Sequence, residues 1–77
     1  MTANEVEQIL RSAWPESQVE VSGEGAKFHV WVRAARFEGL SPVRQQQLVY
    51  GCLQEHISSG VIHAVTMDLG GADNANG

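Results

Sequence analysis

The sequence predicts one small α+β domain in which two helices and three strands follow the order α-β-β-α-β. Its 77 residues suffice for one modest hydrophobic core and leave no material for a second domain. Apolar residues repeat with a helical period in two segments and alternate in two others, and a short β-branched segment follows the second helical one. We therefore expect a three-stranded mixed sheet with a central second strand and both helices on one face.

The first helix is predicted by a capping box at Thr2 and Glu5, a spacing at which each side chain can bond an unpaired amide of the other residue. Its apolar face follows at i, i+3, i+4 and i+7, with Val6, Ile9, Leu10 and Ala13. Pro15 disfavours helical backbone at Trp14, so the helix is expected to end there.

A β-hairpin is predicted next. Val19 and Val21 flank Glu20 in a strand that begins at Gln18, and the glycine-rich residues 22–25 supply turn chemistry. In residues 28–35 the inward positions alternate with the outward ones. The inward residues are Phe28, Val30, Val32 and Ala34, and the outward residues are His29, Trp31, Arg33 and Ala35.

The second helix is predicted to begin with Ser41 as its N-cap and Pro42 in its first turn. Its apolar positions are Leu48, Val49, Cys52, Leu53 and Ile57, and residues 58–60 supply the stop signal. Residues 61–69 are apolar and β-branched enough for a third strand, parallel to the second. The tail, residues 70–77, carries no large apolar group and is expected to be disordered.

The net charge of −4 is unevenly distributed: residues 1–26 carry −4, residues 27–44 carry +3, and the remainder carries −3. The acidic total argues against general attraction to nucleic acid. The basic middle segment is still a candidate face for a partner or a nucleic acid, although a solvated face that balances the acidic flanks is the simpler interpretation. Its residues are Lys27, Trp31, Arg33, Arg36 and Arg44.

No enzyme is predicted, because the chain has no GxSxG, P-loop or GxGxxG pattern and its one thiol, Cys52, lies on the apolar stripe of a helix. A single cysteine excludes an internal disulfide and CxxC motifs, which fits a reducing compartment. The apolar stretches are too short to span a membrane and the amino terminus does not resemble a signal peptide. We therefore expect a cytoplasmic, non-catalytic protein that does not bind membranes.

The candidate metal ligands are His29, Cys52, His56 and His63. Cys52 and His56 are four residues apart on one helix, but packing into the core is the simpler role for that pair. His63 follows the turn between helix and third strand, where a side chain emerges at the edge of the fold. An iron–sulfur cluster needs four ligands, normally thiolates, so a partner would have to supply the sulfur.

Four segments resemble the BolA family, most closely its IbaG-like bacterial branch: residues 21–28 (VSGEGAKF), 36–41 (RFEGLS), 43–51 (VRQQQLVYG) and 62–65 (IHAV). They occur in the family's order and spacing, and the resemblance covers nearly all of residues 3–69. It implies a fold similar to class II KH domains, with residues 1–69 as the BolA-like domain.

The resemblance also implies a monothiol glutaredoxin as partner, with a [2Fe-2S] cluster shared between the two proteins. His63, from the Ile-His-Ala motif, would be the histidine ligand. Family members take a second ligand, Cys or His, from the loop between the first two strands, where this chain has Glu24 and Lys27. Three alternatives stay open: Glu24 binds iron weakly as a hard ligand, His29 substitutes after a shift of strand register, or the chain binds glutaredoxin without completing a cluster.

The leading hypothesis is a non-catalytic adaptor in iron–sulfur cluster assembly or trafficking. One alternative is a KH-like nucleic-acid-binding regulator of transcription or stress response. It is weakened because residues 45–47 are Gln-Gln-Gln where many BolA proteins have Arg-His-Arg, and because no GxxG loop occurs. The other is a metal-free interaction module that binds glutaredoxin or a second copy of itself through Trp31.

Overall fold

The computed structural model describes residues 1–71. The elements in chain order are α1 (Ala3–Ala13), β1 (Gln18–Glu24), β2 (Lys27–Arg33), a short 3₁₀ helix η1 (Ala35–Phe37), α2 (Pro42–Ser58) and β3 (Ala64–Gly70). The predicted order α-β-β-α-β is confirmed, and η1 is an addition that no sequence pattern indicated. Among the described residues, no helix is long and apolar enough to cross a bilayer.

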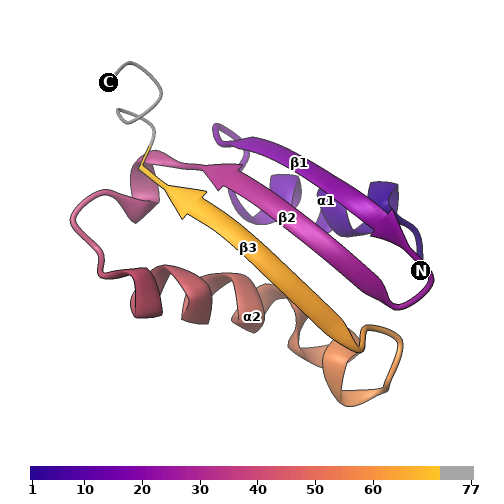
Figure 1. The fold of residues 1–77 in the computed structure, drawn as a ribbon. Coiled ribbons are helices and arrows are strands. Elements are labelled where there is room, and N and C mark those ends of the chain that lie inside the picture. The colour runs from indigo at the N-terminus through magenta and orange to yellow at the C-terminus, as the bar shows by residue number, and fades with distance from the viewer. Residues whose placement is uncertain (72–77) are drawn as a thin grey trace.

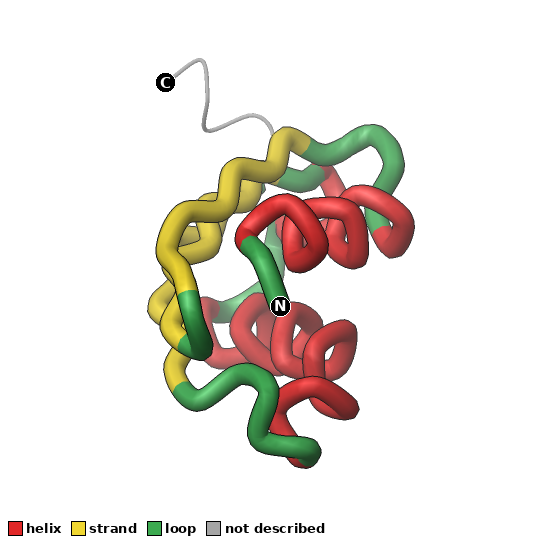
Figure 2. Tube along the Cα trace, turned by 90° about the vertical axis from the view of Figure 1, so that its right-hand side faces the viewer, coloured by secondary structure: helices red, strands yellow, loops and turns green. Residues whose placement is uncertain are grey.

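The three strands form one sheet in the order β1-β2-β3, so β2 is central as predicted. β1 pairs with β2 antiparallel, and β2 pairs with β3 in parallel. Both helices cover the same face, and the opposite face, called here the outer face, carries no helix (Figures 1 and 2). The helix between β2 and β3 is the crossover that a parallel strand pair requires.

The core lies between the helices and the inner face of the sheet. It takes Val6 and Leu10 from α1, Val49 and Leu53 from α2, and alternate residues of the strands. The strand residues are Val19, Phe28, Val30 and Val32, and the core is completed by Ala34, Phe37 and Ile62. The alternation predicted for residues 28–34 is therefore confirmed, whereas Ala13, assigned to the apolar face of the first helix, is exposed.

Both helix starts form as predicted. In the capping box of α1, the Glu5 amide donates to Thr2 Oγ1 at 3.2 Å and the Thr2 amide donates to Glu5 Oε1 at 2.9 Å. The amide of Arg44 donates to the Ser41 hydroxyl at 3.3 Å, and Pro42 opens α2.

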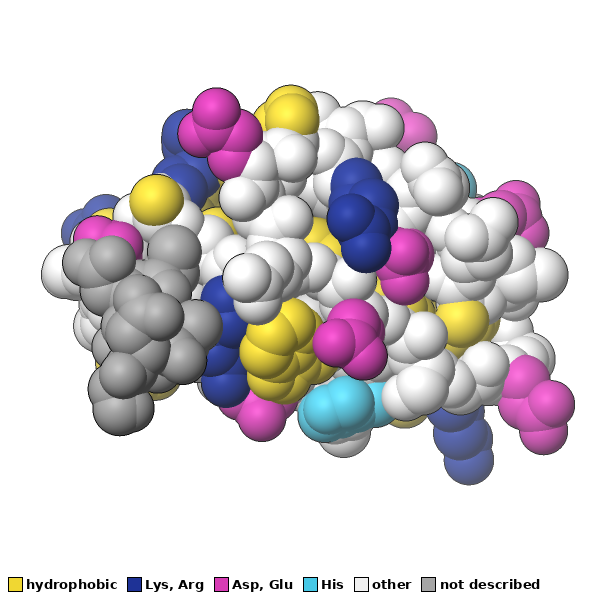
Figure 3. All heavy atoms as spheres, turned by 90° about the horizontal axis from the view of Figure 1, so that it is seen from above, with side chains coloured by type: hydrophobic (Ala, Val, Ile, Leu, Met, Phe, Trp, Pro, Cys, Tyr) yellow, Lys and Arg dark blue, Asp and Glu magenta, His cyan; other side chains and the backbone are white. Residues whose placement is uncertain are grey.

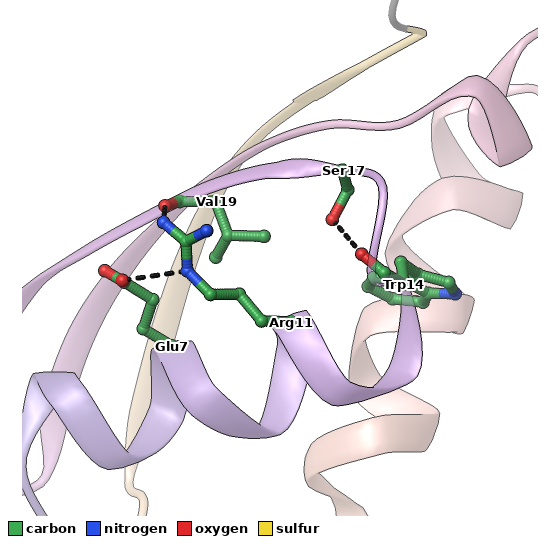
Figure 4. A network of polar contacts seen from close by, with 5 residues as sticks. All are labelled: Glu7, Arg11, Trp14, Ser17 and Val19. Atoms are coloured by element: carbon green, nitrogen blue, oxygen red, sulfur yellow. Dashed lines mark hydrogen bonds and ion pairs between the residues drawn. The ribbon is translucent and has the colours of Figure 1, made fainter.

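Polar contacts fix the far end of α1 to β1 (Figure 4). Arg11 Nε donates to Glu7 at 3.0 Å, and Arg11 Nη2 donates to the carbonyl oxygen of Val19 at 3.0 Å. The Ser17 hydroxyl donates to the carbonyl oxygen of Trp14 at 2.6 Å and closes the turn that leads into the strand. These bonds hold α1 against the edge strand β1, where α1 covers Val19.

The predicted hairpin turn is too early. Ser22, Gly23 and Glu24 belong to β1 and pair with His29, Phe28 and Lys27, so the turn consists of residues 25 and 26. Gly23 stays in the ladder with φ of +112°, a conformation that a glycine adopts without strain. Of the two glycines that indicated a turn, Gly23 therefore lies near the end of β1 and Gly25 lies in the turn itself.

Both limits predicted for the third strand are also wrong. Val61 is 40% exposed and Ile62 is buried in the core. Both belong to the loop before β3, which Ile62 attaches to the core. Gly70, assigned to the tail, is the last residue of β3 and is paired with Arg33, and Gly71 is buried beyond it. The rest of the predicted tail, residues 72–77, lies outside the described residues.

Candidate functional site

His63 lies in the loop immediately before β3, not in the strand as predicted. Its backbone amide donates to the carbonyl oxygen of Ala26 at 2.7 Å, and the amide of Ala64 donates to the same oxygen at 3.2 Å. These two bonds fasten the loop to the turn between β1 and β2. The imidazole is exposed, makes no hydrogen bond to any residue in 1–71, and has Nε2 near Gly60. The main chain of His63 is thus held while its ring remains available.

Glu24 and Lys27 flank the turn to which the main chain of His63 is bonded. Glu24 is paired with Lys27, and Lys27 is paired with Ala64, so Glu24 lies two strands, about 10 Å, across the sheet from Ala64. Glu24 and Lys27 are both exposed. A carboxylate can donate oxygen to a metal, whereas the ammonium group of a lysine has no acceptor lone pair. Of these two residues, only Glu24 can serve as a ligand at neutral pH.

His29 belongs to a different part of the surface. It projects from the outer face, is paired with Thr66, and places Nδ1 2.7 Å from Thr66 Oγ1. It is two positions along β2 from Lys27, about 7 Å along the strand from the row that contains Ala64. The register shift that would make His29 a substitute ligand is not the register observed. The strand register therefore brings neither Glu24 nor His29 directly beside His63.

The surroundings of Cys52 do not favour metal binding by the Cys52–His56 pair. Cys52 packs half-buried against the core, and burial raises the pKa of its thiol, so the thiolate that a metal needs is disfavoured. Within residues 1–71, no group of three His, Cys, Asp or Glu side chains could hold a metal ion. This donor set does not fit a cluster held by the chain alone.

The five residues predicted to form one basic face fall on two surfaces. Lys27, Trp31 and Arg33 share the outer face of the sheet because they alternate along β2. Arg36 lies in η1 and Arg44 in the first turn of α2, after the chain has left the sheet. Arg36 and Arg44 are thus separated from the other three residues by the end of β2.

On the outer face, Arg33 is already occupied. Its guanidinium carbon lies 4.7 Å from the centroid of the Trp31 ring, and Nη2 contacts Asp68 at 2.9 Å. The apolar character of residues 61–69 as a whole gives no indication that Asp68 pairs with Arg33. Alternation counted from Val65 does place Asp68 on the outer face. Seen from above, acidic and basic side chains are interspersed rather than gathered by sign (Figure 3).

The fold is that of a small α+β domain with an exposed imidazole at His63, and comparison with known proteins identifies its family. A family model described as BolA-like protein matches residues 4–73, so the chain belongs to the BolA family. It is 42% identical over 67 residues to the acid stress protein IbaG of Escherichia coli strain K12, covering 87% of this chain and 80% of that protein. No enzyme family is indicated.

Solved structures agree with this assignment. A BolA protein homologue from Coxiella burnetii superposes with a TM-score of 0.86 at 28% identity, covering 100% of this chain and 99% of the other. The BolA domain of SufE1 from Arabidopsis thaliana has a TM-score of 0.84 at 20% identity, covering 94% and 93% of the two chains, and shows the shared fold.

Proposed function

We propose that this protein is a non-catalytic adaptor in iron–sulfur cluster assembly or trafficking. It would pair with a monothiol glutaredoxin and contribute His63 to a shared [2Fe-2S] cluster. The observation that carries the proposal is the combination at His63 of a main chain bonded to the β1–β2 turn and an exposed imidazole. Membership of the BolA family supports the same role. The name of the Escherichia coli relative further suggests that the role belongs to a stress response.

The chemistry of imidazole suits a cluster that is passed on. A neutral ring nitrogen donates one lone pair, and protonation removes it, so the bond should weaken over the acidic range in which histidines titrate. Thiolates from glutaredoxin and glutathione would hold the remaining positions. Acidification should therefore loosen the cluster in the complex with the wild-type protein.

Glu24 is the candidate second ligand on this side. It is exposed and flanks the β1–β2 turn to which the main chain of His63 is bonded. Iron accepts oxygen ligands less well than thiolate in such clusters, so Glu24 would adjust cluster affinity rather than determine binding. We expect Glu24→Gln to reduce cluster retention by a few-fold, compared with full loss of the shared spectrum in His63→Ala.

The direct experiment is to titrate the protein into cluster-loaded monothiol glutaredoxin and to follow visible absorption and circular dichroism. Wild type should give a new cluster spectrum and His63→Ala should not. His29→Ala is the matched control, because it removes another exposed histidine from the same domain and should leave the spectrum intact. Equal spectra for wild type and His63→Ala, or no binding by wild type, would refute the proposal.

A metal-free interaction module is the second candidate, supported by the uncovered outer face and its Trp31–Arg33 stack. Aromatic and arginine side chains are frequent anchors of protein interfaces. Under this alternative, Trp31→Ala would abolish association with glutaredoxin or with a second copy, and His63→Ala would leave it intact. Analytical ultracentrifugation of the two variants with and without glutaredoxin separates these outcomes.

A further inference from the structure

Two arginines of this acidic protein have no carboxylate partner among residues 1–71. The chain carries five Lys and Arg residues in total. Arg11 is paired with Glu7 at 3.0 Å and Arg33 with Asp68 at 2.9 Å. Arg36 and Arg44 make no such contact with the described residues, although acidic side chains outnumber basic ones. Their charges are therefore available to an external anion.

Arg36 and Arg44 line the same groove, which lies between η1 and the first turns of α2. The groove has a volume of about 430 Å³ and is lined by Arg36, Leu40, Arg44, Gln47 and Leu48. It is remote from His63: β2 begins beside the His63 loop and its other end leads into η1. A seven-residue strand separates the two places by about 20 Å, so they can be occupied independently.

The position of Arg44 does not serve the stability of α2. The amino-terminal end of a helix carries a partial positive charge, which favours acidic side chains and disfavours cations. The first turn of this 17-residue helix holds no acidic residue and does hold Arg44. The helix end, Arg44 and Arg36 therefore concentrate positive potential over the groove. Leu40 and Leu48, both half-buried against the core, provide the groove with an apolar floor.

We infer that this groove, the Arg36–Arg44 groove, docks an acidic peptide segment of a protein partner. Two carboxylates of the segment would meet Arg36 and Arg44, with which they can form charge-assisted hydrogen bonds, and an apolar side chain between them would rest on Leu40 and Leu48. A nucleic acid fits less well, because a chain of net charge −4 repels a polyanion and two cations neutralise few phosphates. The leucine floor also has no role in contacting phosphates.

The test uses the peptide acetyl-Glu-Leu-Glu-Leu-Glu-amide as probe, titrated at low salt into the isotope-labelled protein and followed by NMR. Wild type should show amide shifts confined to residues 36–48, with a Kd of about 1 mM or tighter. Arg36→Gln combined with Arg44→Gln should weaken binding about tenfold. Single substitutions should each lose part of the affinity, and circular dichroism melting checks that every variant is folded.

Lys27→Gln is the matched control for Arg44→Gln, because it removes the same charge from an exposed side chain outside the groove. It should leave peptide binding almost unchanged. The inference is overturned if shifts do not map to the groove, if Lys27→Gln weakens binding as much as Arg44→Gln, or if the glutamine version of the peptide binds equally well. It is also overturned if a short DNA duplex binds through the same arginines more tightly than the peptide.

Discussion

The two ends of the sheet hold the chain together by different means. At the end near His63, the contacts across the β1–β2 turn are main-chain hydrogen bonds to the carbonyl oxygen of Ala26. At the η1 end there are main-chain bonds too, such as that from the Ala34 amide to the carbonyl oxygen of Gly70 at 3.0 Å. A large side-chain contact adds to them: Phe37 is fully buried and meets Trp14 edge-to-face with ring centroids 5.2 Å apart. Substitution of the exposed His63 side chain should therefore leave the fold intact, whereas substitution of Phe37 should disrupt it.

The η1 end also ties its loop to α2 through a side chain. The amide nitrogen Nε2 of Gln45 donates to the carbonyl oxygens of Phe37 at 3.2 Å and Leu40 at 3.0 Å. Gln45 is thus a structural residue, although it belongs to the Gln-Gln-Gln segment that replaces cations of other BolA proteins. The contrast between the ends predicts a gradient of effects, largest at Phe37 and smallest at His63.

The largest effect is expected for Phe37→Ala, which removes a buried ring from the core and from its contact with Trp14. Truncations of this kind lower the free energy of unfolding by about 3 to 5 kcal/mol, which in a domain this small would leave little folded protein. Urea unfolding followed by circular dichroism measures the change. Phe37→Leu, which keeps most of the apolar volume, should be clearly less damaging. A loss below about 1 kcal/mol for Phe37→Ala would contradict the proposed difference between the two ends of the sheet.

Gly23→Ala should come next, at the His63 end, because this end depends on backbone shape. A Cβ at Gly23 would overlap the carbonyl oxygen of Lys27, and the φ of +112° is itself unfavourable for alanine. We expect a loss of about 1 to 3 kcal/mol together with shifts in the amide signals of Ala26 and His63.

Gly51→Ala is the matched control for Gly23→Ala. Gly51 lies within α2, is exposed, and has open space where a Cβ would go. Here alanine should stabilise the protein by about 0.5 to 1 kcal/mol, because glycine is a poor helix former. The two glycine substitutions should therefore have opposite signs in thermal melts, and equal signs would contradict the geometry of the hairpin.

The capping box of α1 should give a smaller, pH-dependent effect. Hydrogen bonds from the backbone and side chain of Thr2 lower the pKa of Glu5, so the carboxylate stabilises the folded state above its unfolded pKa. That contribution is lost as the pH falls through the lowered value. Thr2→Ala should remove about 1 kcal/mol at neutral pH. Because the backbone amide of residue 2 still donates to Glu5, this variant should flatten this part of the acid transition only in part. Thermal melts of wild type and Thr2→Ala from neutral to acidic pH measure this effect. If the two proteins lose stability in parallel as the pH falls, the prediction is contradicted.

The smallest effect on stability is expected for His63→Ala, within about 0.5 kcal/mol of wild type, because the imidazole is exposed and unbonded to the described residues. The backbone amide that bonds Ala26 is kept in the alanine variant. Equilibrium unfolding in urea checks the prediction. A substantial loss of stability would mean that the ring supports the fold, and loss of cluster binding could then no longer be assigned to ligation.

The sequence predicts the elements well where one face of each is buried. Alternation at Phe28, Val30 and Val32 places β2, and the helix caps place both helix starts. The start of β3 was missed because Val61 and Ile62 are apolar for another reason, since Ile62 fills the core from a loop. Length and composition cannot separate such an anchor from the first residues of a buried strand.

The candidate site was predictable in part. His63 could be singled out by its position after the second helix, but its attachment to Ala26 is a main-chain contact that leaves no trace in residue types. Separating Arg36 and Arg44 from Arg33 required knowing where β2 ends. The groove between η1 and α2 depends on a short 3₁₀ helix that no periodicity revealed.

The most direct test of the central claim is pulsed electron paramagnetic resonance of the reduced complex with monothiol glutaredoxin, prepared with isotope-labelled histidine in this chain alone. Coordination by His63 predicts a strong nitrogen coupling that changes with the label, disappears in His63→Ala and persists in His29→Ala. A complex in which the cluster signal forms without any labelled nitrogen coupling, or keeps that coupling in His63→Ala, would contradict the account.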